Sequence, residues 1–187
     1  MDALIVSFLA VATAEMGDKT QLVALYLASR FHRPVPIILG ILAATLASHL
    51  AAGLIGQWIG VMLSGNILHW LLALSFFAAA IWAFIPDKID SEQINQTHGI
   101  FLTAFIAFSL AEIGDKTQLA TVALAAQFQS LVAVVAGTTI GMMAANVPVV
   151  ILSHTITNHI SIKWVRALSG VLFAFLGIYE LYKIFIL

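Results

Sequence analysis

The chain has 187 residues, of which 61% are hydrophobic and only 9% are charged. A water-soluble domain carries roughly 25% charged residues, so this composition predicts a protein embedded in lipid. The formal net charge of −1 offers no basic field for nucleic acid, and the absence of cysteine excludes disulfides, thiolate metal sites and thiol catalysis.

Six apolar segments follow one another along the chain, each close to the ~20 residues that a helix needs to cross the hydrocarbon core. The first segment lacks the basic start of a signal peptide, so we expect it to be a retained spanning helix. Clusters of Gly, Pro and polar residues separate the segments, as turns require. The predicted spans are residues 3–29, 35–57, 66–86, 99–126, 129–153 and 162–186.

The two halves of the chain repeat each other. The block AEMGDKTQL at residues 14–22 recurs as AEIGDKTQL at residues 111–119, an offset of 97 positions. Nine nearly identical residues that carry three charges indicate a duplication rather than biased composition. The sequence therefore predicts a single transmembrane domain, 1–187, with a first three-helix repeat (1–86), a central cytoplasmic linker (87–98) and a second three-helix repeat (99–187).

Each half holds three predicted spans, an odd number, so the second half must enter the membrane upside down relative to the first. Inverted repeats with a site near the midplane are a recurring plan of secondary transporters. The predicted fold class is thus an all-α membrane protein of six transmembrane helices in two inverted repeats. Basic residues concentrate in or beside the first, third and fifth loops, and the positive-inside rule then puts those loops in the cytoplasm and both termini outside.

The repeated block places ionisable residues deep within apolar segments. In each copy a Glu, an Asp and a Lys stand at positions i, i+3 and i+4, which share one face of a continuous helix. A charge at the bilayer centre costs at least ~2.5–3.5 kcal/mol, so these side chains must face the bundle interior. We expect the two faces to converge on one site. The six residues are Glu15, Asp18, Lys19, Glu112, Asp115 and Lys116.

The charge count suggests what this site binds. Four carboxylates and two ammonium groups leave a charge of −2, which one divalent cation or two protons would neutralise. Oxygen ligands without thiolates suit hard ions such as Mn²⁺, Ca²⁺ or Mg²⁺. Because protons and metal compete for the same clustered carboxylates, the two fluxes become coupled. We therefore predict an antiporter that needs no cofactor besides the transported ion.

Neighbouring polar residues have two interpretations each. Thr20, Gln21, Thr117 and Gln118 could supply neutral oxygens to the ion or hydrogen-bond the lysines. The glycines between the acids, Gly17 and Gly114, either let the helix unwind locally or allow tight helix packing. A purely structural network of salt bridges is the alternative to an ion site, although buried ion pairs stabilise poorly once desolvation is counted.

Other polar residues give weaker signals. His49 and Asn146 fall at equivalent positions of the second and fifth spans, where both could line the ion pathway or simply hydrogen-bond another helix. Glu180 and His69 lie near span ends, so we expect them at the solvated interface.

The doubled Glu-x-Gly-Asp-Lys-Thr block, with one copy in each three-helix half, resembles the Gdt-type manganese/calcium:proton antiporter family of the cation/calcium exchanger superfamily. Its bacterial members resemble the MneA manganese exporters, and the short loops of this chain resemble those of bacterial members. The resemblance implies export of Mn²⁺, or alternatively Ca²⁺, from the cytoplasm in exchange for protons, across a bacterial inner membrane. It also implies that the metal ligands are Glu15, Asp18, Glu112 and Asp115.

Two other classes of protein stay open from the residues. Asp18 and Asp115 could be the catalytic pair of an intramembrane aspartyl protease, but the Gly-x-Gly-Asp pattern of those enzymes lacks its first glycine here. A passive channel could use acidic rings for cation selectivity without alternating access. A homodimer is compatible with so small a bundle.

Overall fold

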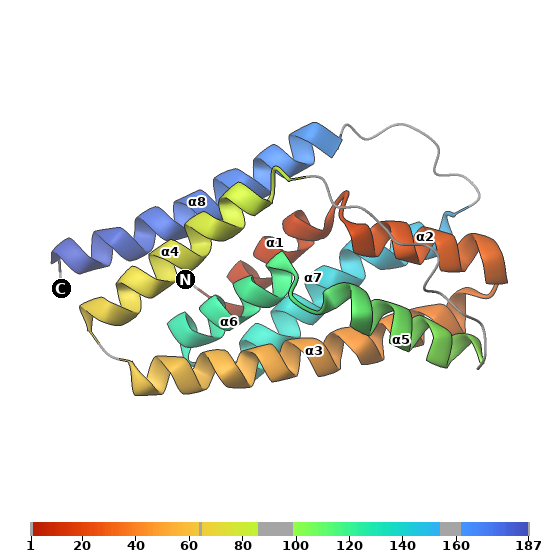
Figure 1. Cartoon of the computed structure of the whole chain (residues 1–187), viewed down its shortest axis with the longest axis horizontal. Coiled ribbons are helices and arrows are strands. Elements are labelled where there is room, and N and C mark those ends of the chain that lie inside the picture. The colour runs from red at the N-terminus through yellow and green to blue at the C-terminus, as the bar shows by residue number, and fades with distance from the viewer. Residues whose placement is uncertain (1, 64, 86–98, 154–161, 187) are drawn as a thin grey trace.

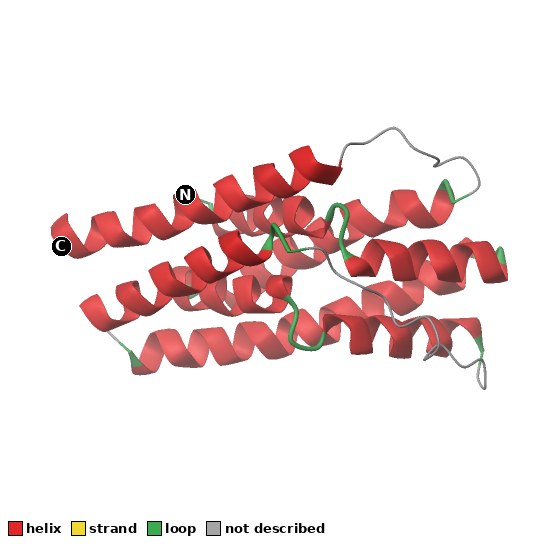
Figure 2. Ribbon diagram, turned by 45° about the horizontal axis from the view of Figure 1, so that its top comes forward, coloured by secondary structure: helices red, strands yellow, loops and turns green. Residues whose placement is uncertain are grey.

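A computed structural model describes residues 2–63, 65–85, 99–153 and 162–186. All regular secondary structure in these ranges is helical, and most helices run roughly along the long axis of the molecule (Figures 1 and 2). The helices are α1 (Ala3–Glu15), α2 (Lys19–Phe31), α3 (Pro34–Met62), α4 (Asn66–Trp82), α5 (Ile100–Glu112), α6 (Lys116–Phe128), α7 (Leu131–Ile151) and α8 (Ile162–Ile186).

Two of the predicted spans are not continuous helices. The span predicted at 3–29 divides into α1 and α2, and the span predicted at 99–126 divides into α5 and α6. Gly17 and Gly114 interrupt them with φ angles of 78° and 68°, the left-handed region that glycine enters without steric cost. Local unwinding is therefore confirmed. A Cβ added at Gly114 would meet no atom within 4 Å, so tight packing does not explain this glycine.

The internal repeat governs where the helices begin and end. An offset of 97 residues relates both ends of α1 to those of α5, both ends of α2 to those of α6, and the start of α3 to that of α7. The left-handed residues that end α2 and α6 also correspond, with φ of 52° at His32 and 51° at Gln129. In Figure 1, α1 and α2 run from left to right, whereas α5 and α6 run from right to left.

The two halves exchange packing partners. Helix α3 of the first half packs on α5 and α6 of the second, and α7 of the second packs on α1 and α2 of the first. Small residues permit the close approach. A Cβ added at Gly40 would lie 2.7 Å from that of Ala104 on α5, and one added at the equivalent Gly137 would lie 2.9 Å from that of Ser7 on α1. Neither half thus forms a separate core.

The distribution of side chains is that of a membrane protein. Large apolar residues cover the outside, among them Leu54 (51% exposed), Trp58 (62%) and Val132 (81%), while carboxylates and a lysine lie buried. Three helical stretches are long and apolar enough to cross a bilayer, Pro34–Met62, Leu131–Ile151 and Ala167–Phe185, and α1, α4 and α5 are shorter apolar helices. Lipid rather than water is the solvent that this surface fits.

Some predictions fall outside the described residues. These are the central linker 87–98 and the loop between α7 and α8, including the basic side chains near its end. The placement of the termini and of the basic loops relative to a membrane stays a prediction.

Candidate cation site

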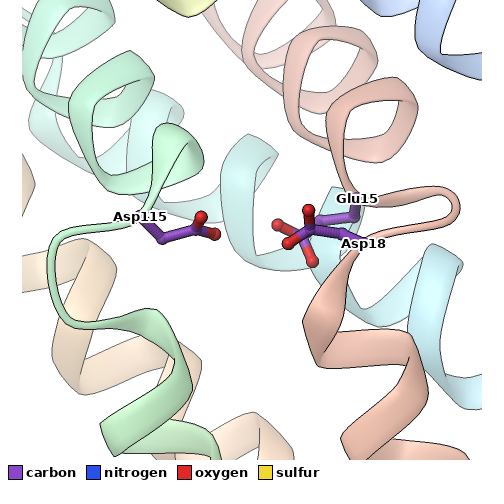
Figure 3. A group of neighbouring side chains, drawn as sticks. All are labelled: Glu15, Asp18 and Asp115. Atoms are coloured by element: carbon purple, nitrogen blue, oxygen red, sulfur yellow. The ribbon is translucent and has the colours of Figure 1, made fainter. Parts of the chain in front are cut away.

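The two helix breaks bring carboxylates from both halves together in the middle of the molecule. Figure 3 shows Asp115 on one loop pointing toward Glu15 and Asp18 on the other. One carboxylate oxygen from each of these three residues lies within 4.8 Å of the others. All three residues are buried, with 0% of Glu15 and 1% of each aspartate exposed. The predicted convergence of the two motifs on one buried place is thus present for three of the four acids.

The breaks, not a helical face, produce this convergence. The prediction that Glu and Asp share one face of a continuous helix was wrong, because Glu15 ends α1 and Asp18 is the N-cap of α2. Asp115 is likewise the N-cap of α6. An N-cap aspartate usually accepts a hydrogen bond from a backbone amide of its helix's first turn, but neither of these does so. Both carboxylates point instead toward the opposite half.

Each aspartate is balanced by the lysine of the other half. Lys116 Nζ forms a buried ion pair with Asp18 Oδ1. Lys19 Nζ lies 3.6 Å from Asp115 Oδ1, with 22% of the lysine side chain exposed. The lysines were expected to project with the acids of their own motif, and the unwound loops send them across the interface instead. Two positive charges therefore already face the three carboxylates.

The threonines of the motif bind carboxylates of their own half. Thr20 Oγ1 donates a hydrogen bond to Glu15 Oε2, and Thr117 Oγ1 donates one to Asp115 Oδ2 at 3.1 Å. Within the described part of the chain, Glu15 Oε1 has no hydrogen-bond partner. A buried carboxylate oxygen without a donor is costly, so this atom is available to a cation.

Glu112 departs from the symmetry of the site. It is buried, but its Oε1 accepts a hydrogen bond of 2.6 Å from Thr45 on α3, and it is not among the three clustered carboxylates. The residue equivalent to Thr45 in the second half is Met142, so Glu15 has no such partner on α7. Sequence reasoning missed Thr45, for which the only signal was a hydroxyl within an apolar helix.

The motif glutamines brace the loops. The Gly17 amide donates to Gln21 Oε1 at 2.7 Å, and Gln21 Nε2 donates to the carbonyl of Ala145 on α7 at 2.8 Å. The second half repeats this arrangement, where Gln118 accepts from Gly114 at 3.0 Å and donates to Ser48 Oγ on α3 at 3.1 Å. The glutamine oxygens expected near the ion are thus engaged by backbone amides.

His49 and Asn146 occupy equivalent buried positions on α3 and α7, with 1% and 0% of each residue exposed. Neither ring nitrogen of His49 has a hydrogen-bond partner in the described part of the chain. Asn146 Nδ2 donates to the Met142 carbonyl one turn earlier at 3.1 Å, while its Oδ1 has no partner there. Neither residue belongs to the carboxylate cluster, so their role in a pathway stays a prediction.

Buried carboxylates at paired helix breaks, inside a bundle with an apolar exterior, are typical of multi-pass secondary transporters of cations. Comparison with known families agrees. A family model described as "Divalent cation/proton antiporter GDT1" matches residues 3–91 and 100–185. The chain belongs to this family, which confirms the resemblance drawn from the doubled motif.

Curated relatives extend this finding. A protein of Vibrio cholerae serotype O1 named "Putative manganese exporter" is 45% identical over 179 residues, which cover 95% of this chain and 90% of that protein. A GDT1-like protein of Synechocystis is 28% identical, with 92% and 93% covered, and GDT1-like protein 5 of Arabidopsis thaliana is 27% identical, with 90% of each covered. No solved structure gives a significant match.

Family membership decides between the classes that the residues left open. The family exchanges divalent cations for protons, so the protein is a transporter and not an intramembrane enzyme. Its substrates are a divalent cation and protons.

Proposed function

We propose that this protein exports Mn²⁺ from the cytoplasm in exchange for protons, with Ca²⁺ as the alternative cargo. The observation that carries the proposal is the buried group of three carboxylates, Glu15, Asp18 and Asp115, which draws oxygens from both motifs to within 4.8 Å of one another. Glu112 is the fourth proposed ligand, and it would join the other three by giving up its hydrogen bond with Thr45.

The ligand chemistry supports a hard divalent cation. Carboxylate oxygens without thiolate or imidazole in the group suit Mn²⁺, Ca²⁺ and Mg²⁺ rather than softer metals. Manganese is preferred because it is the metal in the name of the Vibrio cholerae relative. Ca²⁺ stays the alternative because it accepts the same oxygens at higher coordination number.

The charges of the cluster account for exchange. The lysines already paired with Asp18 and Asp115 must give way when a divalent cation binds the carboxylates. When the cation leaves, protons on the carboxylates compensate for the lost charge. The site is therefore occupied by metal or by protons, and alternation between the two states couples the fluxes.

We further propose six membrane crossings in two inverted repeats, with α1–α2 and α5–α6 each crossing as one broken helix. Each of these helices has 13 residues, or about 20 Å at 1.5 Å per residue. Two such helices in line span about 40 Å, so centring the pair on a hydrocarbon core of ~30 Å puts the break near its middle. The opposite directions of the two pairs in Figure 1 support the inversion. The proposed membrane is the bacterial inner membrane, with both termini outside the cytoplasm.

The test is transport by the purified full-length protein in liposomes under an imposed pH gradient. We expect Mn²⁺ to move uphill against its own concentration gradient while protons move down theirs, and this transport should stop when a protonophore abolishes the proton gradient. Parallel assays with Ca²⁺ and Mg²⁺ rank the ions. Downhill Mn²⁺ flux that ignores the proton gradient would contradict exchange and indicate a channel.

Variants of the carboxylates test the site. Glu15→Gln and Asp115→Asn keep size and polarity but remove charge, so both should abolish Mn²⁺ transport. The matched control is Asp2→Asn, because Asp2 is an exposed acid that caps α1 through Leu4 N at 3.0 Å. Transport by Glu15→Gln at the parental rate would show that the ion binds elsewhere.

A further inference from the structure

A fifth buried carboxylate among the described residues lies on α8, away from the candidate cation site. Glu180 on α8 was expected at the solvated interface, but it is 0% exposed. Its Oε2 lies 2.7 Å from His69 Nδ1 on α4, and its Oε1 accepts hydrogen bonds from Gln127 Nε2 on α6 at 2.6 Å and from Lys183 Nζ at 2.8 Å. We call these four residues the Glu180 cluster. It joins three helices through one carboxylate.

Among the described residues, the position equivalent to Gln127 forms no comparable cluster at the other end of the molecule. Gln127 corresponds by the offset of 97 to Arg30, which is exposed and donates to Tyr26 Oη of its own helix at 2.6 Å. The cluster lies at the end where α4 begins and where α6 and α8 end. The repeated motif therefore does not explain it, and in the proposed topology its place at one end of the bundle puts it toward one side of the membrane.

The chemistry of the cluster is that of proton exchange. Three donors surround an ionised carboxylate, and because Glu180 then only accepts, the Nδ1 of a neutral His69 must carry the ring proton. Nε2 is left with its lone pair, and 21% of the His69 side chain is exposed. A proton from solution can add at Nε2, which leaves the Nδ1–H bond to Glu180 in place and makes it charge-assisted. Imidazole is the side chain that ordinarily titrates between about pH 5 and 8.

One described acid lies at the same end of the molecule, Asp2, the exposed N-cap of α1, whose carboxylate caps its own helix through Leu4 N. Among the described residues of the helices packed around the cluster, the charged or titratable groups of α8 near Glu180 are Lys183, Tyr179 and Tyr182, and Lys183 Nζ lies 4.6 Å from the Tyr179 ring centroid. On α4 the only such group is His69. Those of α1 and α6, Glu15 and Lys116, sit at the opposite ends of their helices.

The geometry points to a second proton-binding site, formed by His69 and Glu180, which fastens the end of α6 to α4 and α8. This inference rests on the proposed proton exchange. Helix α6 begins at Lys116, the partner of Asp18, and reaches Gln127 in the cluster. A proton at His69 strengthens the bond between α4 and α8 on the carboxylate that also holds α6. Protonation at this end thereby favours one position of the helix that carries part of the cation site.

His69→Asn is the decisive variant. The asparagine amide can take the place of Nδ1 as donor to Glu180, so the contact is kept while the titrating group is removed. The assay is Mn²⁺ transport by the full chain in liposomes between about pH 5 and 8, the range in which imidazole titrates. We expect the pH profile to lose one titration step. The matched control is His32→Asn, at an exposed left-handed position that asparagine tolerates, and it should keep the parental profile.

Two results would overturn the inference. One is a His69→Asn profile identical to the parental one, and the other is a uniformly lower rate with an unchanged pH dependence, which is what a purely structural cluster would give. Because a Glu180→Gln variant could fail to fold, histidine NMR of the metal-free protein in detergent supplies a second measurement. A His69 resonance, assigned by its absence in His69→Asn, that does not titrate would also overturn it. If wild-type protein moves no Mn²⁺ with protons, the proposed function fails, and a titrating His69 resonance would still show the proton site.

Discussion

Lys116 of the second motif pairs with Asp18 of the first, although 98 residues separate them in the chain. The same relationship holds in reverse between Lys19 and Asp115, at 3.6 Å. The candidate cation site is therefore assembled from two halves that each leave a carboxylate to be balanced by the other.

Removing one partner of the buried pair between Asp18 and Lys116 should destabilise the protein more than removing both partners. Asp18→Asn or Lys116→Met alone leaves an uncompensated buried charge, for which a cost of about 3–5 kcal/mol is expected. The double variant removes both charges and should lose less stability than the two single losses together. Thermal unfolding of the four proteins in detergent measures the cycle. Strictly additive losses would show that the two groups do not interact.

The left-handed glycines should resist substitution. Gly17→Ala and Gly114→Ala place a Cβ at φ of 78° and 68°, which costs roughly 1–2 kcal/mol per residue. Asparagine at the same positions should be tolerated better, because it enters this region more readily. Gly99→Ala is the matched control, since Gly99 has φ of −55° and an added Cβ there meets nothing within 4 Å. Melting temperatures of the purified variants check this order of stability. A Gly114→Ala variant with the same melting temperature as Gly99→Ala would contradict it.

Removing the hydroxyl of Thr45 tests whether Glu112 joins the ion. In Thr45→Val, Glu112 loses its 2.6 Å hydrogen bond, and its Oε2 already lacks a partner in the described part of the chain. The metal-free protein should lose about 1–3 kcal/mol, the cost of an unsatisfied buried group. If Glu112 becomes a ligand, Mn²⁺ should raise the melting temperature of Thr45→Val by more than it raises that of the wild type.

Thermal shifts with and without Mn²⁺ provide this measurement. Thr138→Val is the control, because Thr138 is also buried but donates to the Val135 carbonyl of its own helix at 3.2 Å. An equal Mn²⁺-induced shift in Thr45→Val and wild type would remove Glu112 from the ligand set.

Substitution of His49 separates a pathway role from a structural one. The ring is 1% exposed and neither nitrogen is hydrogen-bonded in the described part of the chain, so His49→Leu removes unsatisfied polar atoms and should not lower the melting temperature. Mn²⁺ transport should nevertheless fall if the imidazole faces the ion path. Unchanged transport together with unchanged stability would assign His49 to the packed core alone.

The sequence predicted the repeat and the convergence of the two motifs, because nearly identical blocks of charged residues in apolar segments allow few other placements. It left the role of Gly17 and Gly114 open, since a glycine in an apolar run is compatible with both packing and unwinding. The expectation of a shared helical face followed from assuming unbroken helices. Once the helix breaks, side chains at i and i+3 no longer follow helical spacing.

Contacts between distant helices could not be predicted. The bond from Thr45 to Glu112 depends on how α3 lies against α5, and the burial of Glu180 depends on α4, α6 and α8 meeting at one end. Neither contact produces a periodic pattern of apolar and polar residues in the sequence. Glu180 was assigned to the interface by its distance from the centre of its span, which says nothing about the neighbours that cover it.

The ion pairs between each lysine and the aspartate of the other half also bear on how such a chain could arise. A lone three-helix unit would carry an aspartate and a lysine that find their counterparts only on another unit. In the inverted arrangement proposed above, the smallest assembly that balances these charges is two units in opposite orientations, so an unduplicated ancestor would have had to insert in both orientations and associate as a dimer. Joining the two copies in one polypeptide would fix the proposed opposite orientations, and each copy is then free to diverge, as the equivalent positions Thr45 and Met142 have done.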